Sequence, residues 1–155
     1  MPIQKTLLPI ERSANVSDLH IDYINGKKEL EKFYSYRPDQ SSLLKAIKDI
    51  STFKFDRKTL VDAITNQYAS SGVKPPSSVN RLSENNTYTV CTGHQLCLFT
   101  GPLYFIYKLI STINLAESLK KEDPTSNFIP VYWMASEDHD FEEVDHVTIF
   151  GKKIK

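Results

Sequence analysis

The chain has no surplus of charge of either sign and no long hydrophobic run. Its 155 residues carry 19 Lys and Arg against 19 Asp and Glu, so the formal net charge is zero at pH 7. A protein that binds nucleic acid through bulk charge needs a basic surplus to neutralise phosphates. A membrane-spanning helix needs about 20 apolar residues, whereas the longest apolar segment, residues 103–110, is interrupted by Lys108. We therefore expect neither a nucleic-acid partner nor a membrane location.

Cysteine is also scarce. The two cysteines, Cys91 and Cys97, lie six positions apart, which fits neither a Cys-x-x-Cys site nor a secreted disulfide scaffold. The first five residues lack the apolar segment of a secretory signal. These features predict a reducing, cytoplasmic environment. Cys91 is expected in the core and Cys97 on a loop, and neither is expected to act as a nucleophile.

The first 80 residues predict helices joined by polar turns. Apolar residues recur at helical spacing over residues 41–50 and 56–69, and Asp39 is a candidate N-cap of the first of these helices. Two adjacent prolines make residues 74–78 a linker, since proline cannot continue a helix. We predict a helical N-terminal segment at residues 1–80 and a second part of different architecture at 81–155.

The second part predicts a βαβ unit. Residues 87–92 are β-branched and aromatic and predict a strand that ends at Gly93. A long helix is expected over 103–121, with Pro102 in its first turn. The nearly all-apolar residues 127–135, Trp133 among them, predict a strand buried on both faces. A last short strand is expected at 147–150.

This order predicts an α/β fold in which two polar segments meet. The two strands of a βαβ unit are parallel, and open α/β sheets bind ligands at the carboxyl ends of their strands. Residues 93–95 follow the first strand and residues 137–140 follow the second. So small a parallel sheet cannot cover itself, and we expect the chain to be a fragment of a longer protein.

The first polar segment has the features of an anion site. A helix N-terminus offers free N–H donors, and glycine lets a backbone approach an anion closely. The segment fits neither the Walker A pattern nor the dinucleotide Gly-x-Gly-x-x-Gly pattern. The candidate nucleotide- or substrate-binding residues are Thr92, Gly93, His94, Gln95, Thr100, Gly101, Pro102 and Lys108. The alternative is a tight turn capped by Thr100.

The second polar segment is acidic. Six carboxylates and two histidines fall within residues 137–146. They offer oxygen ligands for Mg²⁺, a site for a substrate amine, or a general base, whereas the histidine spacing matches no standard zinc site. The candidate catalytic residues are Glu137, Asp138, His139 and Asp140, and no metal ligand is assigned. The alternative is a solvated acidic loop.

Both segments carry a family resemblance. Residues 92–108 read Thr-Gly-His-Gln-x-x-Leu-Phe-Thr-Gly-Pro-Leu-Tyr-x-x-x-Lys. Residues 131–146 read Val-Tyr-Trp-Met-Ala-Ser-Glu-Asp-His-Asp-Phe-Glu-Glu-Val-Asp-His. Together, in this order, they resemble the N-terminal region of the BshC family. This is the cysteine-adding enzyme family of bacillithiol biosynthesis. The common family form has Gln at the position of His94 and Gly at that of Cys97, so these two residues depart from it.

The resemblance implies a Rossmann-like, nucleotidylyltransferase-like core and a ligase that joins cysteine to glucosaminyl malate. ATP would activate the cysteine carboxylate, with Mg²⁺ as a candidate metal. The full-length family protein would form a homodimer through a C-terminal coiled coil that is absent here. Two alternatives stay open: a nucleotide-binding fragment without turnover, and a metal-dependent hydrolase that uses residues 137–146. The isolated chain is expected to be inactive.

Overall fold

The structure is a computed structural model that describes residues 4, 6–12, 15–138 and 141–155. The chain packs as two compact units, Met1–Thr52 and Phe53–Lys155. This division concerns packing, and the domain boundary predicted between residues 80 and 81 stays a prediction. No helix among the described residues has the length and apolar character to cross a membrane.

The first unit is helical. Its elements are η1 (Ile10–Arg12), α1 (Asp18–Asn25), η2 (Lys28–Phe33) and α2 (Gln40–Ile50). The predicted cap is confirmed, because a carboxylate oxygen of Asp39 accepts a hydrogen bond from the N–H of Ser42 at 2.9 Å. Gly26 ends α1 in the left-handed conformation, with φ of 69°.

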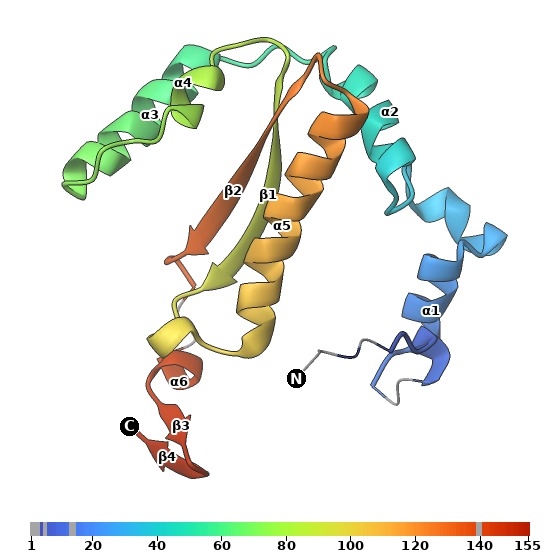
Figure 1. The fold of residues 1–155 in the computed structure, drawn as a ribbon, viewed down its shortest axis with the longest axis vertical. Coiled ribbons are helices and arrows are strands. Elements are labelled where there is room, and N and C mark those ends of the chain that lie inside the picture. Colours follow the sequence, from blue (N-terminus) through green and yellow to red (C-terminus); the bar gives the residue numbers. More distant parts are fainter. Residues whose placement is uncertain (1–3, 5, 13–14, 139–140) are drawn as a thin grey trace. The chain divides into compact units, whose positions relative to one another are not determined.

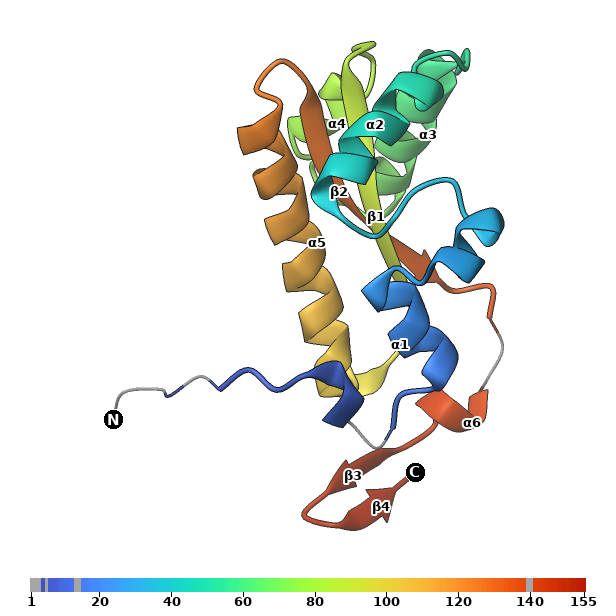
Figure 2. The ribbon, with the colours of Figure 1, turned by 90° about the vertical axis from the view of Figure 1, so that its right-hand side faces the viewer.

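The second unit contains the predicted βαβ unit. Its order is α3 (Arg57–Ser70), α4 (Ser78–Arg81), β1 (Thr87–Gln95), η3 (Leu98–Thr100), α5 (Leu103–Glu122) and β2 (Asn127–Ala135). The two strands are parallel and in continuous register from Thr87 opposite Asn127 to Gln95 opposite Ala135. Figures 1 and 2 show α5 running alongside both strands. The fold prediction is therefore confirmed.

A short hairpin follows the βαβ unit. It comes after α6 (Phe141–Val144) and consists of β3 (Val147–Ile149) and β4 (Lys152–Ile154). Its two-residue turn, Phe150–Gly151, has positive φ at both positions, 48° and 74°. The sequence predicted β3 but not β4, because Phe-Gly is not one of the usual turn pairs.

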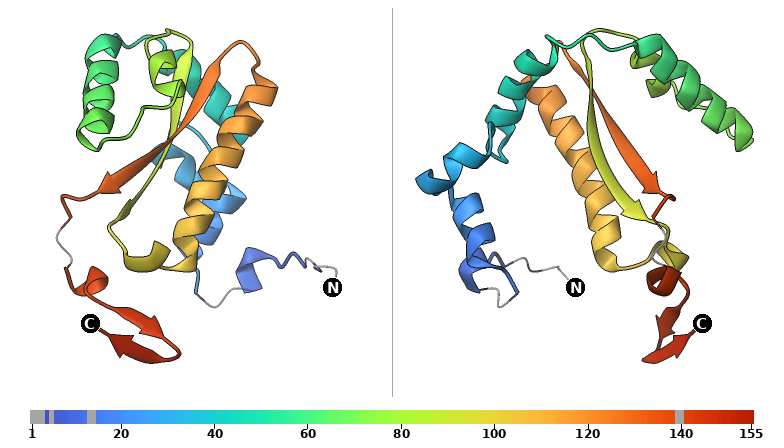
Figure 3. Two further views of the ribbon diagram at one scale, coloured as in Figure 1. Left: turned by 60° about the vertical axis from the view of Figure 1, so that its left-hand side comes forward. Right: turned by 180° about the vertical axis from the view of Figure 1, so that it is seen from behind.

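Three predictions about the strands were wrong. Gly93 does not end β1: the strand continues to Gln95, because pairing with β2 also continues. Trp133 is 60% exposed and Cys91 is exposed, although both were expected in the core. Figure 3 shows α5 against one face of the sheet, and Trp133 and Cys91 belong to the opposite face.

The buried core lies toward the amino ends of the strands. Its apolar members, from α4, α5, β2 and the turn before β1, are Val79, Leu82, Ala116, Leu119 and Ile129. The predicted site at the carboxyl ends of the strands is therefore separate from the best-packed part of this unit.

Candidate functional site

The ends of β1 and β2 bring the two predicted motifs together. Nε2 of Gln95 donates a hydrogen bond to Oδ2 of Asp138 at 2.5 Å, across 43 positions of sequence. Gly93 stands opposite Trp133, and a Cβ at Gly93 would lie 3.1 Å from the Trp133 carbonyl oxygen, so glycine suits this close pairing. The predicted convergence at one edge of the sheet is confirmed, whereas the roles of the residues stay predictions.

The loop between β1 and α5 has an unusual backbone. Phe99, Thr100 and Gly101 all have positive φ, at 50°, 68° and 60°. Pro102 is the N-cap of α5 rather than a residue of its first turn, and it makes no side-chain cap hydrogen bond. The hydroxyl of Thr100 donates to the Phe99 carbonyl oxygen instead of capping α5. The first turn of the helix therefore keeps N–H donors of the kind that bind anions.

Lys108 places a positive charge at the same edge. Its Nζ donates to the carbonyl oxygen of Gly93 at 3.2 Å and lies 5.2 Å from the ring centroid of Tyr104. Among the described residues no carboxylate forms an ion pair with Lys108. Because an ammonium has three donors, this group keeps both its charge and donors for a ligand.

His94 is held by the protein itself. Its Nδ1 lies 3.0 Å from the carbonyl oxygen of Gln95 and its Nε2 lies 2.8 Å from the Tyr104 hydroxyl. A carbonyl oxygen only accepts, so Nδ1 is the donor, and in the neutral ring Nε2 accepts from Tyr104. Both ring nitrogens of His94 are therefore already engaged within the protein, and its predicted role in ligand binding stays a prediction.

Aromatic rings surround His94. Tyr104 stacks on it with ring centroids 5.2 Å apart, and Phe105 meets it edge to face at 5.4 Å. Tyr132 packs against Phe105 and donates its hydroxyl to the carbonyl oxygen of His94. Burial raises the pKa of the Tyr132 hydroxyl, and the neighbouring Cys97 thiol adds to this effect. The ring cluster fixes the end of β1 against α5.

The acidic segment divides between two roles. Near the sheet, Oε1 of Glu137 accepts a hydrogen bond from Nε1 of Trp133 at 3.2 Å. Farther along, Asp145 binds His146 and Lys155 at 2.9 and 2.8 Å, and these hydrogen bonds lower the pKa of the Asp145 carboxyl. Asp145 and His146 thus stabilise the C-terminal hairpin, and Glu137 and Asp138 remain at the sheet edge.

Two predicted catalytic residues, His139 and Asp140, lie outside the described residues. Within the described ranges no group of three or more His, Cys, Asp or Glu side chains is placed to hold a metal ion. The Mg²⁺ suggested by the acidic composition therefore has no ligand set in the described part of the chain.

The sequence also missed two contributors to this edge. Tyr104 and Tyr132 were not among the predicted site residues, although both contact His94. The spacing of Tyr104 four residues before Lys108 was the available signal, since it places the two side chains on one face of a helix. The remaining predicted residue, Thr92, lies half-buried on β1 opposite Tyr132.

Comparison with known proteins places the chain in a family. Residues 3–155 match the family described as "Bacillithiol biosynthesis BshC, N-terminal Rossmann-like domain". Three similar bacterial proteins carry the name "Putative cysteine ligase BshC". The protein of Flavobacterium psychrophilum is 45% identical over 149 residues, which are 93% of this chain and 28% of that protein.

The other two are similar over nearly the same part of the chain. The Christiangramia forsetii protein is 48% identical over 141 residues, 88% of this chain and 26% of the relative. The Bacillus thuringiensis protein is 37% identical over 137 residues, 86% of this chain and 25% of the relative. The chain thus spans little more than a quarter of these relatives, and it belongs to the family of BshC N-terminal Rossmann-like domains.

Proposed function

We propose that this chain supplies the anion-binding edge of a cysteine ligase of bacillithiol biosynthesis. In this reaction ATP converts the carboxylate of cysteine into an acyl adenylate or an acyl phosphate, with release of pyrophosphate or ADP. The amine of glucosaminyl malate then attacks the acyl carbon, displaces AMP or phosphate and loses a proton as the amide forms. The observation that carries the proposal is the hydrogen bond between Gln95 and Asp138, since it brings the two family motifs to the edge where Lys108 lies.

The residues from β1 and α5 suit a phosphate-bearing ligand. The N–H groups of Leu103 and Tyr104 in the first turn of α5 offer positive potential on one side of the edge. The ammonium of Lys108, which forms no ion pair among the described residues, adds to this potential. Such groups would bind the phosphates of ATP, and ATP supplies the activation that amide formation from a free carboxylate requires. Stabilisation of charge that develops on the transferring group is usually the largest contribution to catalysis.

The residues after β2 suit an amine. Glu137 and Asp138 are exposed carboxylates beside this positive side. They would bind the ammonium group of cysteine or of the amino sugar, and a carboxylate or His139 would accept the proton lost by the attacking amine. Because the described residues offer no metal cluster, no step in this proposal passes through Mg²⁺.

Nucleotide binding is tested on the 155-residue chain with Lys108→Gln and, as a matched control, Lys121→Gln in the last turn of the same helix. Trp133 is the only tryptophan in the sequence and adjoins the site, so its fluorescence reports binding. We expect ATP to change this fluorescence and Lys108→Gln to weaken the affinity about tenfold, which corresponds to about 1.4 kcal/mol. Equal affinities for ATP of the two variants would contradict the placement of phosphate beside Lys108.

The assigned chemistry is tested in a full-length family protein with Glu137, Asp138 and His139 each replaced by Ala. We expect each variant to lower bacillithiol in cells and the rate of coupling of cysteine to glucosaminyl malate in vitro. Unchanged thiol levels in all three variants would rule out a site at this edge. Thermal stabilisation of the chain by Mg²⁺ alone, without any response to ATP, would instead favour a metal-dependent hydrolase.

A further inference from the structure

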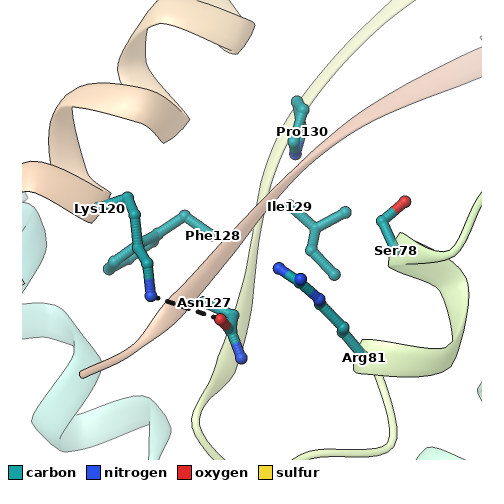
Figure 4. A pocket seen from close by; sticks show the side chains of 7 residues that line it. All are labelled: Ser78, Arg81, Lys120, Asn127, Phe128, Ile129 and Pro130. Carbon is teal, nitrogen blue, oxygen red and sulfur yellow. Dashed lines mark hydrogen bonds between the residues drawn. The ribbon is translucent and has the colours of Figure 1, made fainter. Parts of the chain in front are cut away.

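A half-open surface cavity lies at the other end of the sheet, beside the outer edge of β2, and three of its lining residues, Arg81, Lys120 and Pro130, are exposed. We infer that it binds a small carboxylate with a short apolar chain. It measures about 140 Å³ and is lined by residues of α4, α5 and β2, namely Ser78, Arg81, Lys120, Asn127, Phe128, Ile129 and Pro130 (Figure 4). A single water needs roughly 10–15 Å³ measured in this way, so a small organic acid has room here.

The cavity carries two positive charges and no lining carboxylate. Nζ of Lys120 is held by neutral oxygens, the carbonyls of Pro124 and Ser126 at 2.9 and 2.7 Å and Oδ1 of Asn127 at 3.5 Å. These bonds fix the ammonium without neutralising it. The site therefore has a positive potential that a bound anion would offset.

Arg81 provides the free donors. It reaches from α4 toward β2 in Figure 4, and within the described part of the chain its guanidinium forms no ion pair or hydrogen bond. A guanidinium presents two parallel N–H groups that match the two oxygens of a carboxylate. The hydroxyl of Ser78 adds a further donor on the same wall.

Two carboxylates that bind residues next to or in the lining are already engaged. Glu84 accepts from the side-chain amide of Asn127 at 2.8 Å. Asp123 accepts from the hydroxyl and N–H of Thr125 and from the N–H of Ser126. Neither Glu84 nor Asp123 lines the cavity, so the two cations face it without a competing acid.

The outer edge of β2 is poorly suited to pairing with another strand beside the cavity. The N–H of Asn127 donates toward β1, to the carbonyl oxygen of Asn86 at 2.8 Å. Backbone groups alternate in direction along a strand, so those of Phe128 and Pro130 point to the outer edge. Proline has no N–H to offer there, which disfavours pairing with a further strand at this point.

Apolar side chains in the lining determine which kind of anion the cavity accepts. Phe128, Ile129 and Pro130 line the cavity beside the two cations. An apolar chain of a few carbons would cover these groups while its carboxylate reached Arg81. The ligand class is therefore a short-chain carboxylate rather than a bare inorganic anion.

The test is titration of the isotope-labelled chain with butyrate and with butyramide, its uncharged counterpart of similar shape, followed by NMR. We expect butyrate to shift the amide signals of Ser78 and Ile129 and the Nε–H signal of Arg81, and butyramide to bind at least about tenfold more weakly. Arg81→Gln should weaken butyrate binding by a similar factor, and Lys121→Gln, on the solvent side of α5, should not.

The inference is overturned if butyramide or inorganic phosphate binds as well as butyrate, if Arg81→Gln leaves the affinity for butyrate unchanged, or if the shifts fall elsewhere. The Arg81 side chain forms no hydrogen bond or ion pair among the described residues, and the dispersion of the amide spectrum checks that the variant is folded. The cavity is at the amino ends of the strands, so ATP binding beside Lys108 and butyrate binding beside Arg81 can fail independently.

Discussion

In the loop before α5, Gly101 is a position where the backbone conformation and the neighbouring side chain both leave no room for a Cβ atom. Its φ of 60° and ψ of −150° belong to a region that is almost restricted to glycine. A Cβ at this position would lie 2.7 Å from Sγ and 2.8 Å from Cβ of Cys97. The dihedral angles and the neighbouring side chain therefore both select against any larger residue.

Replacing Gly101 by Ala should lower the free energy of unfolding by about 3 kcal/mol, since the strain of this region is of the order of 1–3 kcal/mol and the contact with Cys97 adds to it. Gly72→Ala is the matched control: its φ is 68°, but nothing lies within 4 Å of the added carbon. The control should lose only about 1 kcal/mol. Urea unfolding measures both values, and equal losses would show that Cys97 does not restrict Gly101.

For several residues of the site, the sequence predicted their place at the sheet edge but not their contacts. The pattern indicated that Gln95 and Asp138 would share an edge, because strand order alone decides that. It did not indicate that Tyr104 would bind His94, since this contact depends on the rotation of α5 against the sheet. Nor did it indicate the left-handed backbone at Phe99 and Thr100, which neither residue favours on its own.

At the scale of elements, local signals identified most of the helices and strands. The Asp39 cap, the apolar spacing of α5 and the β-branched run of β1 are each encoded within a few residues. The end of β1 and the strand β4 are not, because both depend on a pairing partner. The exposure of Trp133 was missed for a related reason: an apolar strand does not reveal which of its faces is covered in this chain.

The turn between α5 and β2 depends on one carboxylate. Asp123 accepts hydrogen bonds from the Thr125 hydroxyl at 2.5 Å and from the Thr125 and Ser126 N–H groups at 3.0 and 3.3 Å. The bonds from Ser126 and Thr125 lower the pKa of Asp123 from 3.8 to about 2. Since β2 starts at Asn127, this turn sets where the strand begins.

We expect the turn to be sensitive to acid. A carboxyl whose pKa is lower in the folded state stabilises the fold above its unfolded pKa, and this contribution disappears as the pH falls through the folded value. For Asp123 the interval runs from pH 3.8 down to about 2. Asp123→Asn should therefore be less stable than the original chain at neutral pH, and the difference should vanish near the lower limit. Urea unfolding at several pH values measures this, and a difference that does not depend on pH would contradict the assignment.

At the scale of the whole molecule, the second unit depends on a contact that joins its helical beginning to its sheet. Nη1 of Arg57, at the start of α3, donates to the carbonyl oxygens of Leu82 and Thr87 at 3.0 and 3.2 Å, and Nη2 donates to that of Asn85 at 3.4 Å. One side chain thus binds both ends of the turn that leads into β1. This contact agrees with the division of the chain after Thr52, which keeps α3 with the sheet.

Arg57→Lys should destabilise the second unit although it keeps the charge, because an ammonium cannot reproduce the planar fork that reaches three carbonyl oxygens. Hydrogen bonds from charged groups contribute about 1.5–3 kcal/mol, and we expect a loss of about 2 kcal/mol in the free energy of unfolding.

The neighbouring Lys58 is the control, since its side chain is 85% exposed and pairs only with Asp62 one turn later among the described residues. Lys58→Ala should leave the free energy of unfolding nearly unchanged, because an exposed ion pair contributes little to stability. Amide hydrogen exchange provides the decisive measurement: Arg57→Lys should speed exchange at the start of β1, around Thr87, more than in α1 or α2. Uniformly faster exchange throughout the chain would instead mean that Arg57 contributes general stability and does not anchor this turn.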